Sequence, residues 1–419
     1  MRALIAGGGI GGLAAALSLH ELGVEVDVYE SVRELRPLGV GINLLPHAVR
    51  ELYELGLEAS IAPAGVLASQ LLYYSKRGQH VWREPRGLGA GYRWPQISIH
   101  RGRLHLLLLD VVRERLGQDR VHTGHHLDRF EEAGDVVRCR FVDRSTGAAL
   151  ATAEGDFLVG CDGIHSVVRA QLHPDEGPAE WNGALMWRGV SAGDPFLDGR
   201  SMIMAGHSRQ KFVAYPIGVA GGGRAEINWV AEIHYATSHP VEREDWDRPG
   251  KLADFLPSFA DWRFGWLDVP DLVRRAEAIY VYPMVDRDPL PRWGHGRVTL
   301  LGDAAHPMYP IGSNGASQAI LDARVLAGCL RSRRDPVEAL AAYESVRRPP
   351  TTAIVLANRH QGPEECMTLA EQRAPAGFER IEDVVSHEEL AAISSKYKRL
   401  AGFSVDELNQ RPSLAHVAY

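Results

Sequence analysis

Three glycines near the start of the chain, Gly7, Gly9 and Gly12, separate an apolar run (3–6) from an alanine- and leucine-rich run (13–19). The first run is typical of a buried parallel strand, and the second favours a helix. In this spacing the first glycine permits a tight turn, the second lets a phosphate approach the backbone, and the third allows the helix to pack closely on the strand. The pattern therefore predicts a unit that binds a dinucleotide at a helix N-terminus.

A second strand is expected over 24–30, and its last residue is an acid, Glu30. A carboxylate at the end of this strand accepts hydrogen bonds from ribose hydroxyls in dinucleotide-binding domains. The glycine pattern does not distinguish FAD from NAD, so an NAD-dependent dehydrogenase remains an alternative.

Two later segments have the form of an apolar strand followed by a turn that contains an acid. The first (156–163) ends in Asp162-Gly163 and precedes Arg169, which could face phosphates; the second (297–303) ends in Gly302-Asp303. Asp303 could accept hydrogen bonds from a polyol. Each segment alone is also consistent with an ordinary strand–turn–helix corner.

A glycine-rich stretch (310–316) opens a further expected helix (317–323). The unsatisfied N–H groups of such a helix start suit an electron-rich carbonyl edge or a developing anion. A plain capped helix after a strand is the alternative.

The bulk composition limits the class of protein. A length of 419 residues indicates two domains, and the net charge of −7 disfavours nucleic acid as a partner. The most apolar later run (104–109) is too short to cross a membrane, and Met1 leads directly into a strand with no secretory signal. Four cysteines without Cys-x-x-Cys spacing argue against disulfides, zinc or a redox dithiol, so we expect a cytoplasmic protein.

The three segments, in this order, resemble the single-component class A flavoprotein monooxygenases, the family of para-hydroxybenzoate and salicylate hydroxylases. The resemblance includes the connection 37–43 and Arg101, and it covers most of residues 1–360. Within the family the chain is most similar to the branch that modifies phenazines. The segments that carry this similarity are 36–49, 95–102, 186–190, 282–294 and 296–323.

The resemblance implies an α/β protein with a Rossmann-type, glutathione-reductase-like FAD-binding domain, a mixed β-sheet substrate domain and C-terminal helices. The expected ranges are 1–72, 100–178 and 284–362 for the FAD-binding domain, 73–99 and 179–283 for the substrate domain, and 363–419 for the helical segment. Strand-like stretches at 201–205, 212–217 and 226–233, and a hairpin over 71–82, agree with the substrate domain. Most of its tryptophans (181, 187, 229, 246, 262 and 266) are expected in the core.

By the same resemblance, the cofactor is non-covalent FAD. The residues expected to hold it are Gly7, Gly9, Gly12 and Glu30 at the ADP half, Arg101 and Asp162 beside the pyrophosphate and ribityl region, Asp303 at the ribityl chain, and Pro310, Gly312, Asn314 and Gly315 around the isoalloxazine.

Five residues are candidates for contact with the substrate: Arg188, Tyr215, Asn228, Met308 and Tyr309. Arg188 could hold a substrate carboxylate or a nicotinamide phosphate, and an ion pair between strands is an equally consistent role.

The resemblance also implies the reaction. NADH or NADPH reduces FAD, O2 adds at flavin C4a, and the hydroperoxide hydroxylates a polycyclic or phenolic aromatic such as a phenazine carboxylate, with or without loss of the carboxylate. No protein acid, base or nucleophile is assigned, because the chemistry resides on the flavin. A catalytically silent FAD-binding scaffold or sensor is the alternative from another class.

Three further features are interpreted as structural. The histidines at 122, 125 and 126 suggest a solvated turn and no metal site, and His306 is expected to make a structural hydrogen bond. Two helices, 335–348 and 351–359, are expected to be separated by Pro349-Pro350. A docked helix near 384–400 could form part of a homodimer surface.

Overall fold

The computed structural model describes residues 1–37, 39–235, 248–360 and 362–419. Within them, a parallel five-stranded sheet forms the centre of the first domain. Its strands in spatial order are β20 (Val298–Leu300), β12 (Phe157–Gly160), β1 (Arg2–Ala6), β2 (Glu25–Glu30) and β8 (Val121–Thr123). The strands of the three sequence motifs are therefore neighbours. Because they are parallel, the loops that follow them meet at one edge of the sheet.

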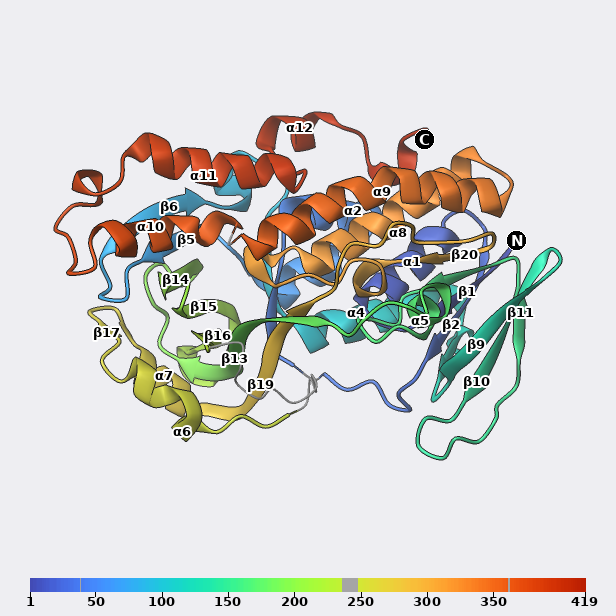
Figure 1. Cartoon of the computed structure of the whole chain (residues 1–419), viewed down its shortest axis with the longest axis horizontal. Helices are drawn as coiled ribbons and strands as arrows, with labels where there is room; N and C mark the ends of the chain where they lie inside the picture. The colour runs from blue at the N-terminus through green and yellow to red at the C-terminus, as the bar shows by residue number, and fades with distance from the viewer. Residues whose placement is uncertain (38, 236–247, 361) are drawn as a thin grey trace.

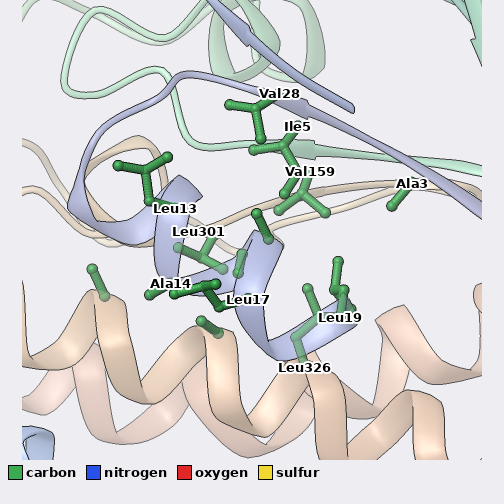
Figure 2. Packing of buried hydrophobic residues seen from close by; sticks show 14 of the residues in the cluster. Ala3, Ile5, Leu13, Ala14, Leu17, Leu19, Val28, Val159, Leu301 and Leu326 are labelled. Carbon is green, nitrogen blue, oxygen red and sulfur yellow. The ribbon is translucent and has the colours of Figure 1, made fainter. Parts of the chain in front are cut away.

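Helix α1 (Ile10–His20) lies between this sheet and α8 (Gly315–Ser332) (Figure 2). Leu13 and Leu17 lie near Leu301, and Leu19 lies near Leu326 of α8 (Figure 2). Nearly all of α1 is buried, which explains why its sequence is alanine- and leucine-rich without a polar face. The remaining helices of this domain are α2 (Pro46–Glu54), α3 (Glu58–Ile61), α4 (Arg101–Leu116), α5 (Val167–Leu172) and α9 (Pro336–Arg359).

A mixed seven-stranded sheet forms the second domain of the described chain. Its strands in spatial order are β19 (Ala276–Asp286), β13 (Glu180–Gly193), β16 (Ala225–His234), β15 (Gln210–Val219), β14 (Ser201–His207), β5 (Gln70–Tyr74) and β6 (His80–Pro85). The strand-like stretches and the hairpin that the sequence predicts lie in these strands. The expected domain boundaries after residues 72 and 283 fall inside β5 and β19.

One face of this sheet carries an aromatic core with α6 (Leu252–Phe255) and α7 (Val269–Arg274). Trp187 stacks on Phe255 with ring centroids 5.1 Å apart, and Trp229 lies 5.9 Å from the same ring. Trp262 belongs to this core and Trp266 packs against it, whereas position 246 lies outside the described residues. Trp187, Trp229 and Trp262 are core residues, as expected, whereas Trp181 is half-buried and lies in none of the apolar clusters.

Smaller sheets connect the two domains and extend the first. The connecting sheet consists of β3 (Gly41–Leu44), β7 (Ile97–His100) and β4 (Val66–Leu67). A separate antiparallel sheet is formed by β11 (Ala153–Gly155), β10 (Val136–Val142) and β9 (His126–Ala133), and a short ribbon by β17 (Arg263–Phe264) and β18 (Leu267–Asp268). Of these, the β3–β7–β4 sheet lies between the five-stranded sheet and the seven-stranded sheet.

The C-terminal segment crosses the molecule as α10 (Glu365–Arg373), α11 (His387–Leu400) and α12 (Val405–Gln410), drawn in red in Figure 1. Cys366, Met367 and Leu390 pack with Leu71 and Met202 on the face of the second sheet opposite the aromatic core. The segment is therefore docked on the sheet. Among the described residues, no helix is both long and apolar enough to cross a membrane.

The predicted helix break at Pro349-Pro350 is wrong, because α9 continues through both prolines. The prolines remove two backbone donors, but the turn around them is held by the Thr351 hydroxyl, which donates to Arg347 O at 2.9 Å and Arg348 O at 3.1 Å. Packing of both halves of α9 on the domain outweighs the local preference of proline.

Candidate cofactor and substrate site

The glycine turn between β1 and α1 contains two close contacts and one open position. A Cβ on Gly7 would lie 2.3 Å from Cys161 O, and one on Gly12 would lie 2.0 Å from Gly7 O. A Cβ on Gly9 would have no atom within 4 Å. Gly7 and Gly12 thus close the turn against its neighbours, whereas Gly9 leaves space at the N-terminus of α1. This is the arrangement that a pyrophosphate requires, so the turn fits FAD.

Glu30 is fixed at the end of β2, directly beside the glycine turn. Its Oε2 accepts a hydrogen bond from Gly8 N at 2.8 Å, and its Oε1 accepts one from Val32 N at 2.9 Å. Oε1 also accepts from Ser31 Oγ at 3.1 Å, whereas Oε2 can accept a further bond. The side chain is therefore oriented by its neighbours, and Oε2 remains available to a ribose hydroxyl.

Asp162 accepts hydrogen bonds from the start of the short helix α5, whose N-cap is Ser166. Its Oδ1 lies 2.5 Å from Ser166 Oγ, and its Oδ2 accepts from Val167 N at 2.7 Å. Burial raises the pKa of the Asp162 carboxyl, and these hydrogen bonds oppose the rise. The carboxylate is engaged within its own loop, while the Asp162 backbone lies against Gly7.

Arg169, after the Asp-Gly motif, connects this motif to the Gly-Asp motif. It pairs with Glu176 and donates from Nη1 to the carbonyls of Ala304 and Ala305, at 3.0 Å each. It is almost fully buried. Arg169 therefore positions the loop that carries Asp303, a role that the sequence reasoning did not assign to it.

Asp303 and Arg101 face the same space. Asp303 is accessible to solvent, yet protein surrounds it closely enough for desolvation to raise its pKa, and His306 and Arg101 oppose that rise. Arg101 is exposed at the start of α4. An accessible carboxylate suits a ligand rich in hydroxyl groups, as the ribityl chain of FAD is.

His306 is structural, as expected. Its Nε2 lies 2.6 Å from Asp322 Oδ2, while Arg347 Nε donates to Asp322 Oδ1 at 2.6 Å and Gly302 N donates to Oδ2 at 3.0 Å. Burial would raise the pKa of Asp322, but His306 and Arg347 lower it to about 2. Asp322 thus anchors the Gly-Asp motif from α8.

The loop before α8 leaves its backbone open on one side and is supported on the other. Gly312 has φ +68°, and its Cβ would lie 2.1 Å from Tyr397 Oη, whereas a Cβ on Gly315 would have no atom within 4 Å. Pro310 is exposed, and the buried Asn314 donates from Nδ2 to Tyr397 Oη at 2.9 Å. The open N–H groups at the start of α8 fit the pyrimidine edge of a flavin.

Tyr397 of α11 is a site residue that sequence reasoning missed. Its hydroxyl also lies 3.1 Å from Ile311 O and 2.9 Å from Asn358 Oδ1. It thus connects the docked tail, the loop before α8 and α9. The only sequence signal was apolar periodicity near 384–400, which predicts a docked helix but not its contacts.

Three of the substrate candidates converge on one backbone residue of β3, Gly41. Arg188 Nη2 donates to Gly41 O at 2.7 Å and Tyr215 Oη donates to the same oxygen at 2.9 Å, while Asn228 Oδ1 accepts from Gly41 N at 2.7 Å. Arg188 Nη1 donates to Tyr282 Oη at 2.8 Å. These side chains attach the second sheet to the strand that follows the 37–43 connection, whose residue 38 lies outside the described chain.

The other two candidates lie in different apolar clusters. Met308 packs with Tyr397 and Phe403 of the tail, whereas Tyr309 is buried with Met186 and Met284 of the second sheet. Burial raises the pKa of the Tyr309 hydroxyl. The loop between them therefore has the tail on one side and the sheet on the other.

A pocket lies between the second sheet, the tail and the Gly312–Ser313 turn. Leu71, Met202 and Met204 come from the sheet, and Phe403 comes from the tail. Glu84, Arg86, Gln96 and Lys398 supply its polar lining. None of these residues was selected from the sequence, because they come from separate strands and from the tail and form no motif.

The described residues include no group of three or more histidines, cysteines or acids that could hold a metal ion. His122 instead stacks on Tyr29, with ring centroids 4.5 Å apart, and lies 2.9 Å from Asp27 Oδ1. All four cysteines are free.

Comparison with known proteins places this geometry in context. The model of a family described as "FAD binding domain" matches residues 1–357. The chain is 51% identical to the phenazine 1,6-dicarboxylic acid hydroxylase PhzS of Lysobacter antibioticus, over 95% of this chain and 96% of that protein. It is 34% identical to the 3-amino-4-hydroxybenzoate 2-monooxygenase of Streptomyces cremeus, over 84% and 85%. The crystal structure of Klebsiella pneumoniae HpxO with FAD and uric acid superposes with a TM-score of 0.73, at 26% identity, over 96% and 92%.

Proposed function

Because the chain belongs to the FAD-binding-domain family and is an FAD-dependent aromatic monooxygenase, we propose that its substrate is a phenazine carboxylate. The observation that carries this proposal is the similarity, over nearly the whole chain, to a hydroxylase of a phenazine dicarboxylic acid. Hydroxylation on the ring and hydroxylation that displaces a carboxylate are both consistent with it.

We propose that FAD lies along the edge where the three motif loops meet. Supporting this are the open face of Gly9, the oriented carboxylate of Glu30 and the accessible carboxylate of Asp303. The residues proposed to hold it are Gly7, Gly9, Gly12, Glu30, Arg101, Asp162, Asp303, Pro310, Gly312, Asn314 and Gly315. When bound, FAD supplies the redox chemistry, accepting electrons from NADH or NADPH and using O2 to hydroxylate the ring.

The protein's own contribution is to bind, orient and exclude water. The start of α8 offers backbone N–H groups to negative charge on the flavin, and burial by the second sheet and the tail strengthens such interactions. Arg188, Tyr215 and Asn228, through Gly41, keep the sheet in register with the cofactor domain. Arg188 and the other four candidates remain proposed substrate-side residues.

The function is tested with the purified holoenzyme. We expect phenazine-1-carboxylate and phenazine-1,6-dicarboxylate to stimulate NADH or NADPH oxidation, and the product formed under ¹⁸O2 to contain one labelled oxygen. Release of CO2 distinguishes displacement of the carboxylate from simple hydroxylation. Stimulation by salicylate or 3-hydroxybenzoate alone would contradict the phenazine assignment, and the absence of labelled product with every ring would favour an FAD-binding scaffold.

We also propose a cytoplasmic location and self-association as a homodimer. The free state of all four cysteines supports a reducing compartment. The outer face of α11 carries exposed polar residues such as Glu388 and Lys396 and is the proposed contact surface. Light scattering on the purified protein measures the mass in solution, and a monomer at all concentrations would exclude the dimer.

A further inference from the structure

The carbonyl group of Gly8, in the turn between β1 and α1, is held by a histidine of α4. His105 Nε2 lies 2.5 Å from Gly8 O, although the two residues are 97 positions apart in the sequence. A carbonyl oxygen only accepts hydrogen bonds, so Nε2 carries the proton and donates it. On the other side of the same residue, Gly8 N donates to Glu30 Oε2 at 2.8 Å. Both polar groups of the Gly8 backbone are therefore fixed by side chains from other elements.

The position of His105 is set by the packing of α4. Leu104 and Leu108 are fully buried in the same apolar cluster as the residues of α1, whereas His105 is half-buried. His105 follows Arg101 by one helical turn, so the two side chains project from the same face of α4. The histidine thus lies at the edge of the domain core, on the face of α4 that also carries the arginine expected beside the pyrophosphate.

The imidazole of His105 is neutral near pH 7. Burial lowers its pKa from the ordinary value of 6.5, and the charge of Arg101 adds to this effect, while the hydrogen bond to Gly8 and the charge of Glu30 oppose it. Because the net shift is downward, the uncharged form with its proton on Nε2 predominates at neutral pH. The bond to Gly8 O is therefore made by a neutral donor, which a side-chain amide can replace.

Fixing the carbonyl of Gly8 also fixes the direction of the next N–H group in the chain. The peptide bond between Gly8 and Gly9 is trans and planar, so the Gly9 N–H points away from the side on which His105 holds the carbonyl. Within the described residues, this N–H donates to no protein acceptor, and a Cβ on Gly9 would have no atom within 4 Å. The free donor and the open face thus occur together at the N-terminus of α1, where negative charge is favoured.

We propose that His105 is a positioning residue for FAD, because by holding Gly8 O it directs the Gly9 N–H towards the phosphates of the cofactor. This inference rests on the proposed position of FAD along the motif loops and is independent of the identity of the aromatic substrate. It adds to the cofactor site a residue that acts through the backbone of the glycine turn and that belongs to none of the three sequence motifs.

The test replaces His105 with two residues of equal length that differ in one group. His105→Gln keeps an N–H donor that can reach Gly8 O, whereas His105→Met keeps the length of the side chain and loses the donor. Both residues are good helix formers, so α4 should be retained. The affinity for FAD is measured by diluting the purified holoenzyme and recording the fluorescence of the released flavin. We expect Kd to rise about five- to fiftyfold in His105→Met and less than about threefold in His105→Gln.

The matched control is Glu114→Met, at an exposed position of the same helix, which should leave Kd for FAD unchanged. Equal loss of affinity in His105→Gln and His105→Met, or no loss in either, would overturn the proposal. Circular dichroism shows whether each variant is folded, and His105→Leu takes the place of His105→Met if the latter does not fold. A folded Met variant that is purified without FAD, while the Gln variant retains it, would support the proposal.

A third variant, Gly9→Ala, separates failure of this proposal from failure of the proposed FAD position. If Gly9→Ala weakens FAD binding and His105→Met does not, FAD lies at the glycine turn and only the role of His105 is overturned. If neither variant weakens FAD binding, the phosphates lie elsewhere and both proposals fail.

Discussion

At the residue scale, the glycines of the turn between β1 and α1 have two different roles. Gly9 has φ −73°, and a Cβ at this position would have no atom within 4 Å, so alanine fits the free protein. We predict that Gly9→Ala leaves the unfolding free energy of the apoprotein unchanged or raises it by up to about 1 kcal/mol. The same methyl group occupies the space of the pyrophosphate, so FAD affinity should fall at least about tenfold.

Thermal unfolding of the apoprotein and fluorescence titration with FAD measure these two effects separately. Gly12→Ala should lower both the stability of the apoprotein and its affinity for FAD, because its Cβ would lie 2.0 Å from Gly7 O. Gly177→Ala, at an exposed position with no atom within 4 Å, is the control and should change neither. Tight FAD binding by Gly9→Ala would show that the phosphates lie elsewhere.

A second prediction at this scale concerns the contribution of the ionised Asp322 carboxylate to stability. Its pKa in the folded protein, about 2, lies below its ordinary value of 3.8, so the unfolded state takes up the proton first as pH falls. The ionised carboxylate therefore stabilises the fold above about pH 4, and this contribution is lost between about pH 4 and pH 2. Asp322→Asn should cost about 3 to 5 kcal/mol at pH 7, because it leaves Arg347 buried and unpaired.

Urea unfolding at a series of pH values measures this difference between wild type and variant. It should be constant near neutral pH and shrink as the pH falls below about 4. Asp135→Asn, whose side chain is fully exposed, should change stability by less than about 0.5 kcal/mol. A difference that does not vary with pH would refute the role of the Asp322 charge.

Residues set by backbone requirements could be predicted from sequence. Gly7, Gly12 and Glu30 lie in a local pattern whose spacing encodes the turn, and Asp303 ends a recognisable strand. Tyr397 and His105 could not be found in this way, because their roles come from contacts with segments far away in the chain. Their surroundings, and not their neighbours in sequence, determine what they do.

At the scale of elements, the docked helix α11 supports the loop before α8 through one hydroxyl. Removing it in Tyr397→Phe leaves Asn314 Nδ2 and Asn358 Oδ1 without this partner in a buried place. We predict a loss of about 1 to 3 kcal/mol in stability. FAD should also dissociate faster, because the loop before α8 is less fixed. Denaturant unfolding and stopped-flow loss of flavin measure the two effects.

Tyr53→Phe, a half-buried tyrosine on α2, is the control and should leave FAD release unchanged. If Tyr397→Phe releases FAD at the wild-type rate while losing stability, the tail supports the fold but not the cofactor loop.

The continuous α9 shows why elements are predicted less reliably than motifs. The proline pair predicts a break, and local physics favours one, but contacts on both sides of Pro349-Pro350 keep the helix whole. The strands of the second sheet were predictable because alternating apolar residues and glycine turns are local signals. Where tertiary packing opposes a local preference, the sequence pattern alone gives the wrong result.

For the whole molecule, the relation between the two domains depends on Gly41, where Arg188, Tyr215 and Asn228 meet. Lysine at position 188 cannot donate to both Gly41 O and Tyr282 Oη in the planar geometry of arginine. We predict that Arg188→Lys lowers kcat several-fold, about equally for acidic and neutral ring substrates, because the sheet is less well aligned with the flavin. Steady-state kinetics with matched acid and neutral rings measures this. A rise in KM confined to the acids would instead identify Arg188 as the substrate contact considered from the sequence.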